Sequence, residues 1–304
     1  MLDTIRVKYP IVPTKEQLEH WTTFLTKTQE GVRQKYVYNY KLDEAMLKYT
    51  YIPTDYSGNP LLLLELSLPK LLFDNNYQMI LGIESTIKMG NIYLQGVPHA
   101  PTLDLAEGIL SRLDICYNHQ VGDAVDDYIR ALGHLGYPHR RTKHHLEEGV
   151  EFRAKHKTTK FYNKERETKK PEAAGILRQE LTVLNSRSVR DLLDIKKPRL
   201  TDITKKIIVE QLENDLAKLR LLGNSIHTKD TAPKQLCKNY GSKAGVYYYG
   251  LLELKTIKSK KEIAVEIDTH PRSLDRHLKK ITDAEIPLTL TDRHEPLPPL
   301  EIKF

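Results

Sequence analysis

The chain has 304 residues, enough for one large domain or two ordinary ones. Hydrophobic residues make up 39% of it and charged residues 29%, a profile that excludes collagen-like, coiled-coil and wholly disordered chains. The longest apolar run has only four residues, so we expect no membrane-spanning segment. Because the first residues lack a signal-peptide pattern and the chain contains only two cysteines, we expect a soluble, cytoplasmic protein.

Strand patterns dominate the first two thirds of the sequence. Alternating, β-branched segments predict strands, and amphipathic segments predict helices. In chain order we expect a strand at 3–9, a helix at 13–25, strands or a hairpin at 36–51, a strand at 61–68 and short strands at 79–84 and 91–95. We then expect a helix at 102–110, a strand at 113–117, a helix at 123–135, a β pair at 149–154 and 159–163, a charged helix, a strand at 177–184 and an amphipathic helix at 203–222.

The last third of the sequence changes character. Residues 223–243 are polar and resemble a linker, and 244–286 predict helices with a turn. The sequence therefore predicts an α+β protein with a mainly antiparallel sheet covered by helices and a small helical C-terminal domain. We expect the two domains to span 1–225 and 240–304.

Basic residues are concentrated in two stretches. The chain has 47 Lys and Arg against 40 Asp and Glu, a net charge of +7. Residues 139–170 hold eleven basic and five acidic residues with four histidines, and residues 255–280 hold eight basic and four acidic ones. Two such stretches suit two contacts with a polyanion, although a solvated surface is the other interpretation.

Five charged residues interrupt apolar strands at alternate positions. Because alternate side chains share a face, Arg112 lies with Asp114, and Arg178 lies with Glu180, each pair opposite an apolar face. Glu65 stands out in the same way among leucines. If the three strands are neighbours, their carboxylates converge and suit a hard cation such as Mg²⁺ or Mn²⁺. Ordinary surface ion pairs are the alternative.

One tyrosine lies within the first basic stretch. Tyr162 shares a strand face with Lys160, and with Lys164 if the strand extends that far. Together with Arg166, these cations lower the cost of forming a phenolate, the form in which a tyrosine attacks phosphorus. A tyrosine of the core or of the surface, beside solvated lysines, is the other interpretation.

Seven segments, in this order, resemble the filamentous-phage gene II family of replication initiators from phages and small plasmids. They are MLDTIRVKYP at 1–10, LELSLPKLL at 64–72, SRLDI at 111–115, KFYNKERE at 160–167, LRQEL at 177–181, GSKAGVYYYGLLELK at 241–255 and SKKEIAVEIDTHPRSLDRHLKK at 259–280.

The resemblance implies a catalytic domain similar to that of the HUH endonucleases. Such an enzyme nicks origin DNA with a tyrosine, stays on the 5′ phosphate and later rejoins the strand, working with a host helicase and polymerase. The family's nucleophile falls on Tyr162 in a Y-x-K pattern completed by Lys164. The implied metal residues are Asp114, Glu180 and Glu65, and the implied DNA-binding residues are Arg112, Arg178, Lys160, Arg166, Arg272, Arg276 and Lys280.

The sequence departs from the family at two points. Gln179 replaces the aromatic residue expected between the arginine and the acid of the second pair. A His-hydrophobic-His triplet is also missing, and so we assign the metal to carboxylates; His144, His145 and His156 are nearby alternatives that more often contact phosphate or solvent.

The tail also predicts a helix-turn-helix without reference to the family. Helices are expected at 260–265 and 272–281, joined by a turn at 267–271. The second helix carries donors suited to base edges in a major groove, namely Arg272, Arg276, His277 and Lys280. A packing module that does not contact DNA is the alternative.

Two other functions fit the same residues. A non-catalytic DNA-binding replication or partition regulator would use the basic surfaces alone. A metallonuclease that uses water would cut DNA without linking to it.

Overall fold

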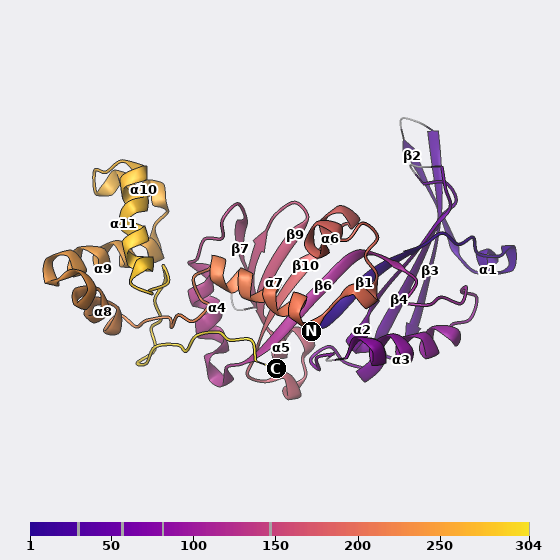
Figure 1. Cartoon of the computed structure of the whole chain (residues 1–304), viewed down its shortest axis with the longest axis horizontal. Coiled ribbons are helices and arrows are strands. Elements are labelled where there is room, and N and C mark those ends of the chain that lie inside the picture. Colours follow the sequence, from indigo (N-terminus) through magenta and orange to yellow (C-terminus); the bar gives the residue numbers. More distant parts are fainter. Residues whose placement is uncertain (29–30, 56–57, 81, 146–147, 304) are drawn as a thin grey trace. The chain divides into compact units, whose positions relative to one another are not determined.

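The computed structural model describes residues 1–28, 31–55, 58–80, 82–145 and 148–303. It is an α+β protein with antiparallel strand pairs and helices, as predicted (Figure 1). Contacts divide the chain into two compact units, each made of two separate stretches. Unit 1 contains Met1–Cys116 and Leu181–Ile208, and unit 2 contains Tyr117–Glu180 and Val209–Phe304. Among the described residues, no helix is both long and apolar enough to cross a membrane.

Unit 1 is built on strands in the order β2-β3-β4-β5-β1-β6. Neighbouring strands within it pair in antiparallel fashion. Buried and exposed side chains alternate along β1, β4 and β5, which confirms the period-two pattern of the sequence. The bounds are β1 Leu2–Tyr9, β2 Thr22–Thr28, β3 Gly31–Leu42, β4 Ala45–Ile52, β5 Leu61–Ser67 and β6 Ile109–Gln120.

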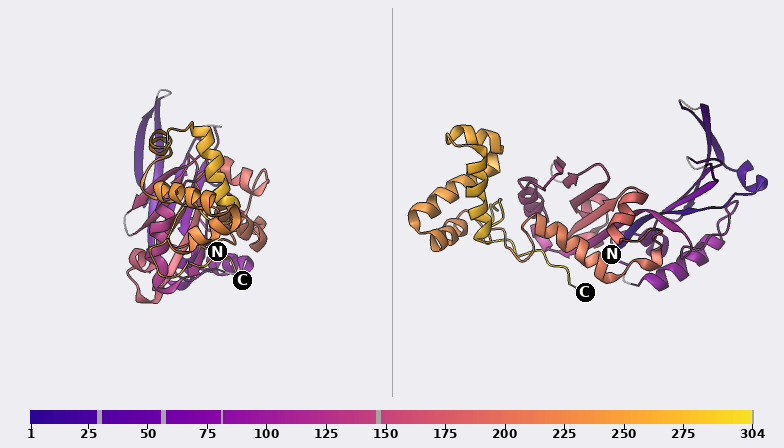
Figure 2. Two further views of the ribbon diagram at one scale, coloured as in Figure 1. Left: turned by 90° about the vertical axis from the view of Figure 1, so that its left-hand side faces the viewer. Right: turned by 45° about the horizontal axis from the view of Figure 1, so that its top comes forward.

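Two helices cover one face of the unit 1 strands (Figures 1 and 2). They are α2, Leu68–Phe73, and α3, Ile83–Gln95. A Cβ on Gly90 of α3 would lie 2.6 Å from Leu105 Cδ1, so a glycine there allows the helix to pack closely. The remaining helical segments of this unit are α1 Lys15–Glu19, α6 Ser186–Leu193 and η3 Leu200–Asp202.

Three local predictions in unit 1 are wrong. The expected helix at 13–25 ends at Glu19, because the threonines that follow favour the strand β2. The expected strand at 91–95 lies within α3, as do the last two residues of the one expected at 79–84; residues 79, 80 and 82 have no regular structure, and residue 81 lies outside the described residues. The expected helix at 102–110 is a turn in which Asp104 Oδ1 accepts from the Ala106 amide, a local bond that competes with helix formation.

Unit 2 contains the strand order β6-β10-β9-β8-β7. The β8–β9 pair and the following short helix confirm the predicted β pair and charged helix. Helix α4 packs on the strands and forms a core with them through Ile129, Leu132, Phe152 and Phe161. The bounds are α4 Val125–Gly133, β7 Arg141–His145, β8 Gly149–Arg153, β9 Lys157–Asn163, α5 Lys164–Thr168, β10 Ile176–Val183 and α7 Lys205–Lys218, with short turns η1 Gly122–Ala124 and η2 Pro171–Ala173.

Strand β10 is buried on both of its faces. All eight of its residues are buried. Gln179, the departure from the family pattern, donates from its amide to the Leu212 carbonyl at 2.9 Å. Its Oε1 lies 3.0 Å from Nε2 of the buried His119. A glutamine at this position therefore satisfies a buried imidazole, which an aromatic side chain cannot do.

The helical tail has a core of its own, around Leu236, Leu251, Leu274 and Ile281. The segment expected to be a linker contains α8, because Ala232 and Leu236 bury one face of a helix. The two helices and the turn predicted at 260–281 are present as α10 and α11. The bounds are α8 Thr231–Tyr240, α9 Ser242–Ile257, α10 Lys260–Glu266 and α11 Pro271–Asp283. The predicted domain division at 225–240 stays a prediction.

Candidate active site

Strand β9 presents Tyr162 on its more exposed face. Phe161 and Thr159 point to the buried side, whereas Lys160 and Tyr162 are half-exposed on the other. This arrangement follows from the two-residue period of a strand, as the sequence predicts. Asn163 then ends the strand by accepting from the Arg166 amide at 3.2 Å, which starts α5 immediately after the tyrosine.

The phenol of Tyr162 is held by a carboxylate. Its hydroxyl donates to Glu180 Oε2 at 3.0 Å, and Glu180 is almost fully buried. A carboxylate in this position orients the phenolic oxygen and is within reach of its proton. The sequence indicates both residues separately, and the structure brings their side chains together.

Lys164 approaches the same ring from the start of α5. The strand ends at Asn163, one residue before Lys164, so the condition under which Lys164 would share the face of Lys160 is not met. Its ammonium nevertheless lies 5.4 Å from the centre of the Tyr162 ring. The lysine side chain is fully buried and pairs with Glu167 at 2.7 Å. A positive charge at this place stabilises a phenolate more than a phenol.

A glycine lies directly across from the tyrosine. Gly149 of β8 pairs with Tyr162 in the strand register. A Cβ at this position would lie 2.5 Å from the Phe161 carbonyl oxygen and 2.7 Å from the Tyr162 Cβ. The close approach of β8 to the tyrosine therefore requires the absence of a side chain.

The face of the strands that carries Tyr162 is strongly basic across β7, β8 and β9. Pairing in register places four cations on this face together with one acid, Glu151. His145 lies on the same face. Burial alone would raise the pKa of Glu151, but Lys160, Arg153 and His145 hold it below its usual value. We call this surface the basic face; its cations are Arg141, Lys143, Arg153 and Lys160.

Two of the predicted metal residues are engaged by arginines in unit 1. Arg112 binds both carboxylate oxygens of Asp114, at 3.1 and 2.7 Å, and Oε1 of Glu65 at 3.0 Å. Arg6 donates to the other oxygen of Glu65 at 2.6 Å. Glu180 belongs to unit 2, so the prediction that the three acids share one cation stays a prediction.

The described residues contain no group of three or more His, Cys, Asp or Glu side chains arranged to hold a metal. Asp114, Glu65 and Glu180 nevertheless offer the oxygen donors that Mg²⁺ and Mn²⁺ prefer. A cation that bound Asp114 or Glu65 would have to displace a guanidinium group from the positions observed here.

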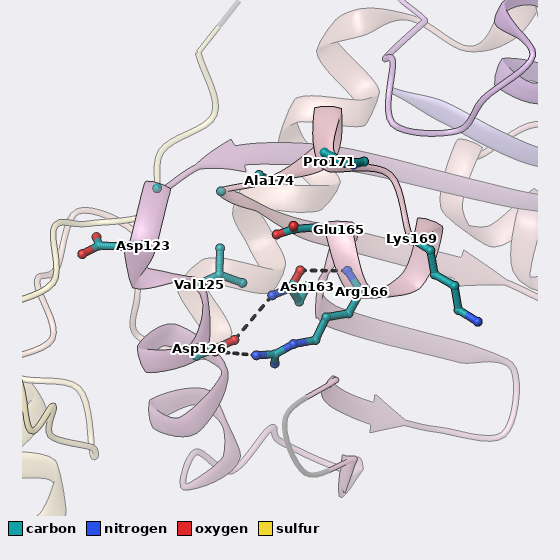
Figure 3. A pocket seen from close by; sticks show the side chains of 11 residues that line it. Asp123, Val125, Asp126, Asn163, Glu165, Arg166, Lys169, Pro171 and Ala174 are labelled. Atoms are coloured by element: carbon teal, nitrogen blue, oxygen red, sulfur yellow. Dashed lines mark hydrogen bonds and ion pairs between the residues drawn. The ribbon is translucent and has the colours of Figure 1, made fainter.

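Of the two predicted DNA-binding arginines of unit 2, Arg178 is buried, whereas Arg166 is exposed and paired with an acid. Arg178 is 0% exposed and has a 3.4 Å hydrogen bond to Asn118 Oδ1, because β10 is covered on both faces. Arg166 pairs with Asp126 at 2.7 Å in a cleft of about 810 Å³ (Figure 3). Asn163, on the opposite face of β9 from Tyr162, also points toward Asp126 in this cleft.

The predicted recognition helix exposes its basic residues. Arg272 and Arg276 of α11 are exposed, and the Arg276 guanidinium donates to Ser273 Oγ at 3.2 Å. Lys280 is exposed as well, with its ammonium 5.9 Å from the centre of the Tyr240 ring. Helix α10 begins with a capping box formed by Ser259 and Glu262.

Several residues of the site were not predicted individually. Arg141, Lys143 and Arg153 contributed to the charge surplus, but only strand register places them on the face of Tyr162. The sequence signal that identifies them is the alternation of basic and other residues from 141 to 145. Gly149 carries no such signal, because its role depends on the neighbouring strand.

The sequence matches no family model, and no curated protein matches it either.

Proposed function

We propose that this protein is a rolling-circle replication initiator that nicks and rejoins origin DNA through a covalent tyrosine intermediate. The observation that supports this most is the hydrogen bond from Tyr162 to Glu180, made at the end of a basic strand face. The resemblance to the gene II family, which is read from short ordered motifs, points to the same residue.

The proposed step uses groups that the site holds. Glu180 accepts the phenolic proton as the Tyr162 oxygen attacks the scissile phosphorus. The bond from phosphorus to the 3′ oxygen breaks, and that oxygen takes up a proton from the protonated Glu180 or from water. This leaves a 3′ hydroxyl on one DNA end and a 5′ phosphotyrosine on the other. Attack by a 3′ hydroxyl on the phosphotyrosine reverses the step and rejoins a strand. The Lys164 ammonium favours the phenolate form throughout.

Two surfaces provide the proposed DNA contacts. The basic face contacts the DNA phosphates near Tyr162. Helix α11 contacts the base edges of duplex origin DNA through Arg272, Arg276 and Lys280. Arg112, Lys160 and Arg166 are proposed to contact the backbone. A contact by Arg178 requires an opening of β10, since the side chain is buried. A host helicase and polymerase are the proposed partners.

A divalent cation is the proposed cofactor. Bound by Glu180 with Asp114 or Glu65, Mg²⁺ or Mn²⁺ would neutralise charge on the non-bridging oxygens of the phosphate. The proton transfer and the attack described above rely on the protein's own side chains.

A labelling experiment tests the proposal. The protein is incubated with Mg²⁺ or Mn²⁺ and a random-sequence pool of single-stranded DNA, labelled at either the 3′ or the 5′ end, and then denatured. We expect labelled protein only with the 3′ label, because the tyrosine keeps the 3′ part of the strand. Tyr162→Phe is expected to give none, while it still binds DNA. Sequencing of the linked DNA then identifies the cleavage site.

The same experiment separates the rival functions. Cleavage without labelled protein would indicate a metallonuclease that uses water. Salt-sensitive binding with neither cleavage nor labelling would indicate a non-catalytic regulator. A labelled adduct that persists in Tyr162→Phe would remove Tyr162 from the nucleophile role.

A further inference from the structure

The more exposed face of the unit 1 strands carries several cations. In β1, β4 and β5 the residues turned away from the buried face are exposed or half-exposed. Register partners share a face, so Asn39, Lys48, Glu65, Arg6 and Arg112 form one row across five strands. We call this surface the lysine face; its six cations are Arg6, Lys8, Lys35, Lys41, Lys48 and Arg112.

Few acids balance these cations. Glu65 and Asp114 lie beside them and are both bound by Arg112, and Asp55 acts on Lys8. Six positive charges against three negative ones leave an excess of three. In the described part of the chain, Lys35, Lys41 and Lys48 form no ion pair with an acid. These three exposed ammonium groups are therefore available to an anionic ligand.

Lys8, one of these cations, has a lowered pKa. Burial lowers its pKa, Asp55 opposes that effect, and the neighbouring charges of Arg6 and Arg190 lower the pKa further. Neighbouring cations that lower the pKa of a lysine also attract phosphates electrostatically.

The same face exposes an aromatic ring. Phe24 of β2 is 45% exposed and pairs in register with Lys35, whose ammonium lies 5.4 Å from the ring centre. An exposed ring beside ammonium groups is the combination with which proteins hold unpaired nucleotides, because an unpaired base stacks on the ring while lysines contact phosphates. A base inside a duplex offers no such face.

We propose that the lysine face binds single-stranded DNA, with Lys35, Lys41 and Lys48 on the phosphates and one base stacked on Phe24. From β2 to β6 this surface extends roughly 24 Å at about 4.8 Å per strand, which suits a few nucleotides. The assignment of DNA as the nucleic acid rests on the proposed function, in which nicking releases a single strand.

Fluorescence anisotropy of the full chain tests this site. The probe is labelled oligothymidylate, with a labelled hairpin duplex as the second probe, and EDTA is present so that no cleavage occurs. The test variant is Lys35→Gln with Lys41→Gln and Lys48→Gln. The matched control removes three other exposed lysines of unit 1, Lys15, Lys88 and Lys196. Thermal unfolding checks that both variants are folded.

We expect the test variant to bind oligothymidylate at least tenfold more weakly and to lose about 2 from the slope of log affinity against log salt. The control is expected to stay within about twofold of the unaltered protein, because its lysines do not belong to the strands that form the lysine face. Phe24→Leu is expected to weaken single-strand binding about fivefold or more and to leave duplex binding unchanged.

Three results would overturn the proposal: unchanged binding by the test variant, an equal loss in the control, or a loss confined to the duplex probe. Each is separate from a failure of the proposed function, which would show as the absence of a protein–DNA adduct.

Discussion

The hydroxyl of Tyr162 donates to Glu180 at 3.0 Å, from one strand of unit 2 to another. A phenol paired with a nearly buried carboxylate has both an oriented oxygen and a proton acceptor. Most of the chemistry proposed for this protein depends on this contact, and four predictions examine it and the structure that supports it.

The first prediction concerns the proton acceptor. Glu180→Gln keeps the size of the side chain but removes its basicity, so we expect adduct formation to slow by about 100-fold or more. Single-turnover formation of the adduct with 3′-labelled DNA measures this rate. Glu165→Gln, an exposed acid of α5, is the control and should react at the normal rate. An undiminished rate in Glu180→Gln would exclude a role for this carboxylate in proton transfer or in cation binding.

The second prediction concerns the space opposite the tyrosine. Gly149→Ala places a Cβ within 2.7 Å of the Tyr162 Cβ, so β8 and β9 must separate. We expect a loss of about 1–3 kcal/mol in the free energy of unfolding together with a lower rate of adduct formation. Chemical denaturation measures the first quantity. Gly136→Ala is the control, because its Cβ meets nothing within 4 Å, and its stability should change little.

The third prediction concerns the pH dependence of stability. Burial lowers the pKa of His119 to about 4, despite hydrogen bonds to Gln179 and to the backbone of Glu301 that favour the charged form. An unfolded histidine titrates near pH 6.5, so the unfolded chain binds the proton first as pH falls. Stability is therefore full above about pH 6.5 and declines toward pH 4, by up to about 3 kcal/mol from this residue.

Denaturation curves at several pH values check the sign and the source of this effect. His119→Asn should flatten the decline between those pH values, whereas replacement of the exposed His156 should leave it unchanged. A decline that is identical in the unaltered protein and in His119→Asn would assign it to other groups, such as His134 and His227, whose pKa values are also lowered by burial.

The fourth prediction concerns the buried acid behind β9. Asp215 accepts from Tyr137 and from Thr159, both at 2.5 Å, and lies 3.6 Å from the Arg140 guanidinium. Asp215→Ala leaves two buried hydroxyls and a cation without their acceptor. We expect a loss of about 3–5 kcal/mol in the free energy of unfolding.

The matched control for Asp215 is Glu213→Ala, an acid on the same helix with a partly exposed side chain. Its unfolding free energy should change by no more than about 0.5 kcal/mol. Equal stability of the two variants would show that the hydrogen bonds of Asp215 contribute little to holding β9 in place.

Local patterns were sufficient for some elements. The sequence predicted the strand that ends at Asn163, the helix that follows it, and both helices of the tail with their turn. These elements are defined by side-chain periodicity and by capping residues such as Ser259, which act over a few neighbouring positions.

Other features depended on contacts between distant segments. Alternation along β10 showed that Arg178 and Glu180 share a face, but not that the whole strand is buried. Residues 79–84 and 91–95 resembled short strands, whereas the structure has one helix over 83–95 whose buried residues include Ile87 and Leu94. The partner of Gln179 is sixty residues away in the sequence, at His119.

The sequence by itself determined the nucleophile candidate, because Tyr162 lies in a dense basic stretch whose strand period is visible locally. Only the tertiary structure decided which cations share a surface. Lys35, Lys41, Lys48 and Arg6 are scattered among apolar residues, and strand register alone brings them together. Periodicity shows which side chains of one strand point the same way, whereas pairing between strands decides which of them become neighbours.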